Sequence, residues 1–258
     1  MDTNGKFLNK LSQALLALTI AWMICAALLP DDAWPLGVLV VIAVVSTLVS
    51  LLRSLQFQNV CVAAATILFI ASAVIFLNAK TSIPFGPFVF TDHCGERLFD
   101  VLPLAPPLLW LVVILNCRGV ARLILRPWRK MRTYGFRVIG LTCLLAALFD
   151  FGLEPFATRA HRFWLWQLTT GKFNFFGAPW INFLGWVVTA LLILAFVTPW
   201  LINKMPGGRR PPDYQPLTLW LALNFFLAAS LATHQLWLPA GLIFAVSATA
   251  TVAVWRNK

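Results

Sequence analysis

The sequence predicts an all-α polytopic membrane protein, a bundle of about eight transmembrane helices with a re-entrant or interfacial segment. Of its 258 residues, 60% are hydrophobic and only 11% are charged, whereas soluble globular domains carry about a quarter charged residues. The apolar residues form long runs, not the alternating segments of about ten residues that are typical of a membrane β-barrel. We therefore expect residues 1–258 to form a single integral membrane domain.

The apolar runs give the expected spans in order. They fall at approximately 11–29, 36–52, 60–78, 98–116, 135–150, 178–202, 216–233 and 236–255. The segment 79–97 contains Pro84, Gly86 and Pro87 in its first half, so it is expected to begin as a loop or re-entrant piece. The segment 151–177 is the longest connection, and its Phe163, Trp164 and Trp166 indicate a helix that lies at the membrane interface.

The positive charges predict the orientation. With eight spans, 15 of the 20 basic residues fall in the loops on the side of the two termini, which predicts a cytoplasmic N-terminus and C-terminus. The same topology accounts for the net charge of +11, so we expect the lipid bilayer and not nucleic acid as the partner. The five cysteines include no CxxC and no zinc spacing, and the sequence predicts neither a metal site nor a cofactor.

Several carboxylates lie in or beside the apolar runs. The chain has nine acidic residues, and five of them fall in two short stretches with a spacing of four: Asp92, Glu96 and Asp100, then Asp150 and Glu154. Ionisable groups at membrane depth are costly and are functional-site candidates for that reason. The spacing puts each set on one face of a helix, if a helix is what they occupy.

Asp150 is the strongest of these candidates. It follows a run of apolar residues, and no Lys or Arg lies within eight residues of it. Burial without a nearby cation disfavours the charged carboxylate, and a carboxylic acid that stays neutral can donate a proton. The alternative is that Asp150 caps the outer end of a span or pairs with Arg97, Arg159 or Arg162. Glu154 precedes Pro155, which biases Glu154 away from a helix.

Asp92 has an equally simple structural interpretation. It follows Thr91 and precedes Gly95, and it could be the N-cap of the fourth span. Glu96 and Asp100 would then continue the first turn, where acidic residues favour the helix dipole.

Aromatic residues form a second concentration between residues 164 and 186. Such residues are typical of the belts of membrane proteins, but they could also form a pocket wall that stabilises a carbocation by cation–π contact. Asn182 is a polar residue in an apolar helix and could bind a neighbouring helix, a substrate or a water molecule. The candidate substrate-binding residues are Trp164, Trp166, Phe176, Trp180, Asn182 and Trp186.

The order of these motifs resembles the membrane carotenoid hydratases, the family of bisanhydrobacterioruberin and γ-carotene 1′,2′-hydratases. Three blocks carry the resemblance: FTDHCG at 90–95 is similar to the family's YTDxLG, FDFGLEP at 149–155 to its WDxxxDP, and WLW at 164–166 with FGAPWINFLGW at 176–186 to its WxW and FGIPxxNFxGW. The match covers residues 84–190 well and the rest only as apolar spans. Phe90, Phe149 and Glu154 stand where the family has tyrosine, tryptophan and aspartate, and Glu154 keeps the carboxylate but moves it by about one methylene.

The resemblance implies a hydro-lyase of carotenoid biosynthesis that adds water, without a cofactor, to a terminal double bond of an acyclic carotenoid end. Asp150, Asp92, Glu154 and Glu96 would be the catalytic residues. The resemblance also implies a bacterial or archaeal cell membrane, a carotenoid substrate and other membrane enzymes of the pathway as partners. Two alternatives stay open: a Mg²⁺-dependent membrane prenyltransferase, whose paired acidic motifs these stretches imitate, and a non-catalytic pigment-binding protein.

Overall fold

The computed structural model of the protein describes residues 3–28, 36–98, 101–167, 174–202 and 212–257. The helices of this part are α1 (Thr3–Leu28), α2 (Leu36–Leu52), α3 (Phe57–Thr81), α4 (Ala105–Ile124), α5 (Tyr134–Pro155), α6 (Trp180–Val197), α7 (Gln215–Thr233) and α8 (Trp237–Arg256). Seven of them form segments long and apolar enough to cross a membrane, and α2, with 17 residues, is shorter. The predicted class, an all-α polytopic membrane protein, is confirmed.

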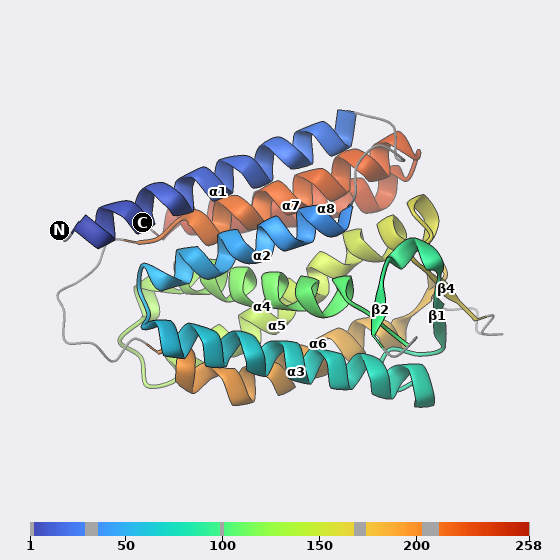
Figure 1. Cartoon of the computed structure of the whole chain (residues 1–258), viewed down its shortest axis with the longest axis horizontal. Coiled ribbons are helices and arrows are strands. Elements are labelled where there is room, and N and C mark those ends of the chain that lie inside the picture. Colours follow the sequence, from blue (N-terminus) through green and yellow to red (C-terminus); the bar gives the residue numbers. More distant parts are fainter. Residues whose placement is uncertain (1–2, 29–35, 99–100, 168–173, 203–211, 258) are drawn as a thin grey trace.

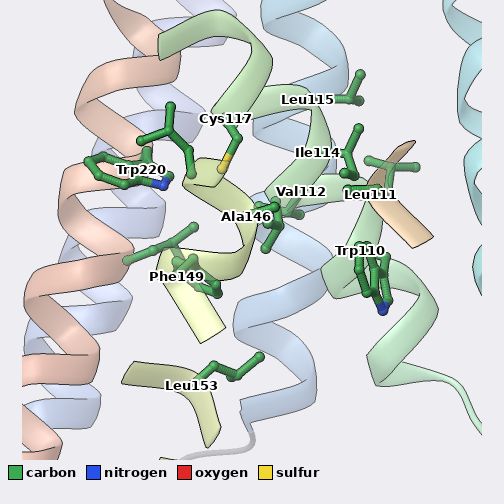
Figure 2. Packing of buried hydrophobic residues seen from close by; sticks show 14 of the residues in the cluster. Trp110, Leu111, Val112, Ile114, Leu115, Cys117, Ala146, Phe149, Leu153 and Trp220 are labelled. Atoms are coloured by element: carbon green, nitrogen blue, oxygen red, sulfur yellow. The ribbon is translucent and has the colours of Figure 1, made fainter. Parts of the chain in front are cut away.

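Helix α4 is the centre of the bundle. It packs against α2, α3, α5, α7 and α8, and its residues Leu111–Leu115 are all buried. Its buried residues include Asn116 and Arg118 as well as apolar side chains, so neighbouring helices cover most of its surface. Figure 2 shows this packing, with Cys117 of α4 near Trp220 of α7 and Val112 of α4 near Ala146 of α5.

The helices run roughly along one axis, and the short strands gather at one end of it (Figure 1). The start of α1 and the end of α8 lie at the opposite end. The strands are β1 (Phe88–Phe90), β2 (Arg97–Leu98), β3 (Leu102–Pro103), β4 (Trp164–Trp166), β5 (Asn174–Phe175) and β6 (Ala178–Pro179). They form three antiparallel pairs, β1 with β4, β2 with β3 and β5 with β6, so loops that are far apart in the sequence cover this end together.

The connection between α5 and α6 differs from its prediction. Residues 164–166 form strand β4, not an interfacial helix, and Phe88 pairs with Trp166 and Phe90 with Trp164. Backbone hydrogen bonds continue the ladder, from Thr91 N to Phe163 O at 2.9 Å and from Gln167 N to Pro87 O at 3.0 Å. The aromatic residues within 163–166 predict a helix at the membrane interface, but aromatic residues also favour strands.

The fourth span begins later than predicted. Helix α4 starts at Ala105, with Pro106 and Pro107 in its first turn, because proline lacks an N–H and is best accepted there. The preceding residues form the β2–β3 pair, so the part of the predicted run before Ala105 is not helical where the structure describes it.

Helix α5 continues five residues beyond its predicted end. Pro155 is inside it, and a π-helical turn follows at Phe156–Ala160. The wider turn gives His161 N a hydrogen bond to Phe156 O at 3.0 Å, and Thr158 Oγ1 donates to Glu154 O at 2.8 Å. These bonds occupy two of the carbonyl groups at the C-terminal end of the helix, where regular helical partners run out. Glu154 therefore remains helical, one turn after Asp150.

The turn at residues 82–86 fixes the start of β1 to the bundle. Asn78 of α3 donates from Nδ2 to Gly86 O at 3.0 Å and accepts from Phe85 N at 2.8 Å, so one buried side chain binds two consecutive residues of this turn. Gly185 of α6 allows the close approach, since a Cβ there would lie 2.7 Å from Phe85 Cδ1 and 2.8 Å from Pro84 O. The start of β1 is thereby held against α6.

Candidate active site

Asp150 and Glu154 lie one helical turn apart on the inner face of α5. They are 0% and 1% exposed, the most complete burial of any acidic side chains in the described part of the chain. The two ion pairs found among the described residues join Arg53 to Asp213 and Arg97 to Asp92, so neither involves this carboxyl pair. Two buried carboxyl groups without a cation are costly unless polar groups or protons compensate them.

Three side-chain donors contact the pair. Trp164 and Trp166 of β4 donate from Nε1 to Glu154 Oε1 at 3.0 and 2.5 Å. Asn182 of α6 donates from Nδ2 to Asp150 Oδ2 at 2.6 Å and lies 3.3 Å from Glu154 Oε2. Asp150 Oδ1 is buried and has no hydrogen-bond partner among the described residues. Residues from α5, β4 and α6 thus form one polar cluster inside an apolar bundle.

The cluster faces a chamber of about 720 Å³. Helices α2, α4, α5, α6 and α7 contribute to its wall, together with β1, β4 and the turn that follows Thr81. Glu154 and Asn182 line it, whereas Asp150 is not among the lining residues. Glu154 is therefore the carboxyl group that a ligand in the chamber would meet, and Asp150 lies behind it.

The wall of the chamber is mainly aromatic. Trp110 of α4 stacks on Trp186 of α6 with ring centroids 4.2 Å apart. At the end near the strands, Phe88 lies 5.2 Å from the Trp166 ring, and further aromatic lining residues are Phe85, Phe90, Phe149, Phe156, Phe163, Trp164 and Phe226. Aromatic faces around a carboxyl group can stabilise a cation that forms beside it.

The predicted substrate-binding residues divide into two groups. Trp164, Trp166, Asn182 and Trp186 line the chamber. Phe176 and Trp180 do not, and they belong to a second aromatic cluster in which Phe175 contacts both rings. Trp180 is half exposed. Trp180 and Asn182 are close in sequence, but neighbouring residues of a helix point in different directions.

The structure does not bring Asp92 and Glu96 to the buried pair. Asp92 begins a 3-10 turn, Asp92–Cys94, and its fully exposed side chain accepts a hydrogen bond from Arg97 Nη2 at 2.9 Å. Glu96 is exposed as well. The expected helix that would put Asp92 and Glu96 on one face is absent there, so the expected convergence with Asp150 is not met. Asp31, Asp32 and Asp100 lie outside the described residues.

The alternative roles of these acids also differ from expectation. Asp92 does not cap α4, which begins at Ala105. Asp150 is inside α5, caps no helix, and is not paired with Arg97, Arg159 or Arg162 in the described structure. Arg159 instead donates from Nε to Phe176 O at 2.9 Å and holds the β5–β6 loop.

A polar rim that sequence reasoning assigned no definite role lies at the strand end of the chamber. His93, Cys94, Gly95, His161 and Arg162 line it, and His161 Nε2 is 3.3 Å from Ser230 Oγ of α7. Burial raises the pKa of the Cys94 thiol to about 11, so this thiol is neutral at physiological pH and is not a nucleophile. The histidines carried no spacing signal, because they come from separate loops.

Metal ligation has no obvious location in this arrangement. No group of three or more His, Cys, Asp or Glu side chains is close enough to hold a metal ion in the part of the chain that the structure describes. The expectation of a metal-free site stays a prediction.

Fold and chamber together define an integral membrane protein with a buried carboxyl pair in an aromatic cavity. A family model described as carotenoid biosynthesis protein matches residues 35–250. The chain belongs to this family, and its role is in carotenoid biosynthesis. Neither a curated protein nor a solved structure matches the chain significantly.

Proposed function

We propose that this protein is a carotenoid hydratase, which protonates the terminal trisubstituted double bond of an acyclic carotenoid end and adds water to the resulting cation. The observation that carries the proposal is the position of Glu154, whose carboxyl group lines an aromatic chamber inside the membrane domain. An isolated alkene is a weak base, so its protonation needs an acid that water does not surround.

The first step is proton transfer from the pair. Because no cation contacts Asp150 or Glu154 among the described residues, retaining a proton costs the pair less than carrying two charges. Glu154 Oε2 is the oxygen we assign to that proton, since both indole donors bind Oε1 and Oε2 accepts only the longer hydrogen bond from Asn182 Nδ2, at 3.3 Å, among the described residues. After transfer, the two indole N–H groups and Asn182 stabilise the carboxylate that Glu154 becomes.

The second step is stabilisation of the tertiary cation. Protonation at the less substituted carbon leaves the positive charge on the carbon that bears two methyl groups. Trp164, Trp166 and Trp186 line the chamber around Glu154 and supply π faces to that charge. Their position on β4 and α6 keeps the rings fixed, since each of these elements is held to α5 through the carboxyl cluster.

The third step is the addition of water. We assign its entry to the rim at His161, which connects the chamber to Ser230. The oxygen bonds to the cationic carbon, and the proton that water loses returns to Glu154, the carboxyl group that lines the chamber. One C–H bond, one C–O bond and one regenerated acid result, so no oxidant, reductant or cofactor is consumed.

Asp92 and Glu96 are outside this scheme because both side chains are exposed, and Asp92 pairs with Arg97. The prenyltransferase alternative requires both acidic motifs to face one diphosphate, and the exposed ion pair of Asp92 with Arg97 does not favour it. The pigment-binding alternative leaves the buried carboxyl pair without a use. The cytoplasmic location of the termini and partnership with other pathway enzymes stay predictions.

The proposal is tested by expression in a bacterial host that accumulates lycopene. We expect products heavier than lycopene by one water per modified end, unchanged when membranes are assayed with EDTA. Loss of activity with EDTA would favour the transferase class. Carotenoid retained by the purified protein without any change of mass would favour the pigment-binding class.

A further inference from the structure

One face of α2 forms a side wall of the chamber. Leu36, Leu39, Val40 and Ala43 line the cavity with the spacing of a single helical face. Gly37 also lines it, although it is exposed at the outer surface of the protein. A residue that belongs both to the cavity wall and to the surface marks a place where the cavity opens.

The opening at Gly37 faces an apolar surface. Gly37 is one helical turn before Val41, which is 49% exposed, so the two share the outward side of α2. The helix contains no charged residue over its whole length, Leu36–Leu52. A Cβ added at Gly37 would meet no atom within 4 Å. Glycine is therefore not required there by packing, and it leaves space open.

This opening differs in chemistry from the rim of the chamber. The other exposed lining residues, His93, Gly95 and Arg162, lie in the loops at the strand end, and two of them are polar. Gly37 lies instead among the apolar residues of a helix. Water is expected at the polar rim, and hydrocarbon is expected at the opening beside Gly37.

This inference rests on the proposed function. Under that function, a chamber of this size needs an apolar opening. A volume of about 720 Å³ is in the range that encloses a drug-sized ligand. A carotenoid is a rigid extended polyene whose length approaches the apolar thickness of a bilayer, about 30 Å. The reacting end fits into the chamber, and the remainder has to leave it through an apolar opening.

We propose that Gly37 forms the side opening through which the unreacted part of a linear polyene passes from the chamber into the surrounding lipid. The chamber then holds one chain end at a time, and a substrate with two identical ends is released and rebound between its two hydrations. The singly hydrated product therefore accumulates before the doubly hydrated one.

The test is a graded series, Gly37→Ala, Gly37→Leu and Gly37→Trp, expressed in a lycopene-producing host. Val38 is the matched control position, because it is adjacent on α2, 39% exposed and not a lining residue. We expect Gly37→Ala to change the conversion by no more than about twofold and Gly37→Trp to reduce it by about tenfold or more. Val38→Trp is expected to resemble the wild type.

Equal conversion by the Gly37→Trp and Val38→Trp proteins, in membranes with equal amounts of folded protein, overturns the inference and leaves the hydratase proposal standing. If the Trp variant does not fold, the Leu pair at the same two positions decides in the same way. If the wild type hydrates nothing, the readout is lycopene retained by the purified proteins. Weaker retention by the Gly37 variants then supports the opening without the reaction, and equal retention overturns it.

Discussion

Trp166 Nε1 donates a hydrogen bond to Glu154 Oε1 at 2.5 Å and joins the loop strand β4 to the end of α5. Trp164 donates to the same oxygen at 3.0 Å. Residues two apart in a strand point to the same side, so the WLW sequence supplies two parallel donors to one carboxylate oxygen. Oε1 of Glu154 therefore binds both indoles, and Oε2 is left with the longer hydrogen bond from Asn182 at 3.3 Å.

Replacement of either indole is expected to weaken catalysis without removing an aromatic ring. Trp166→Phe and Trp164→Phe each delete one donor to the carboxylate formed in the reaction, and a hydrogen bond to a charged group contributes about 1.5–3 kcal/mol. We expect the rate of hydration to fall by about tenfold to a hundredfold. Trp128→Phe, at an exposed position outside the chamber, is the control. Wild-type rates in both chamber variants would contradict the role given to the indoles.

Glu154→Gln is expected to abolish hydration while the protein still folds. The amide oxygen can accept from both indoles, but the amide group cannot give a proton to an alkene, and general acid catalysis contributes about a hundredfold to ten-thousandfold. Product formation per folded protein, measured by mass spectrometry in the lycopene host, is the test. Substantial turnover by Glu154→Gln would remove Glu154 from the role of acid.

Asp150→Asn is expected to have a smaller effect than Glu154→Gln. Asp150 lies behind the lining carboxyl group and contacts it through Asn182. The replacement retains an oxygen for the Asn182 donor but removes a proton site from the pair. A greater loss for Asp150→Asn than for Glu154→Gln would reverse the assignment of acid and partner.

The Asp92→Asn variant tests whether Asp92 has the catalytic role that the motif similarity implies. The motif similarity predicts that Asp92 is catalytic, whereas the structure places its side chain in solvent with Arg97. Exposed ion pairs contribute about 0–1 kcal/mol, so we expect hydration to stay within about twofold of wild type. Loss of all product at normal protein levels would mean that the 90–95 segment closes over the chamber during the reaction.

The sequence was sufficient for the class of fold, and it singled out Asp150 and Glu154 as candidates. The apolar runs predicted the spans, but the fifth span was expected to end at residue 150, and Pro155 was expected to bias Glu154 away from a helix. The extension of α5 through Pro155 could not be predicted, because it depends on the π-helical turn that follows and on Thr158, whose hydroxyl donates to Glu154 O.

The pairing of β1 with β4 beside the site could not be predicted for a different reason. Strand β4 pairs with β1, more than seventy residues earlier, and such a pairing leaves no local signal beyond the alternation of WLW. Once residues 164–166 are a strand, both indoles point toward Glu154. The motif at 90–95 then serves as the start of the loop that follows β1, and Thr91 rather than Asp92 contacts the site loop, through Phe163 O.

The close approach of α6 to the turn before β1 gives a stability prediction. Gly185→Ala places a Cβ 2.7 Å from Phe85 Cδ1 and 2.8 Å from a backbone oxygen, and such overpacking costs about 1–3 kcal/mol. Gly140→Ala on α5 is the matched control, since nothing lies within 4 Å of the added atom. We expect a lower thermal unfolding temperature in detergent only for Gly185→Ala. Equal unfolding temperatures would show that the turn moves freely away from α6.

Hydration of lycopene in deuterated water measures the central claim most directly, namely that an acid of the buried pair protonates carbon and water supplies the oxygen. We predict one carbon-bound deuterium beside each new hydroxyl group in the wild-type product, and no product from Glu154→Gln. A hydroxylated product without carbon-bound deuterium, formed equally well by both proteins, would contradict the account.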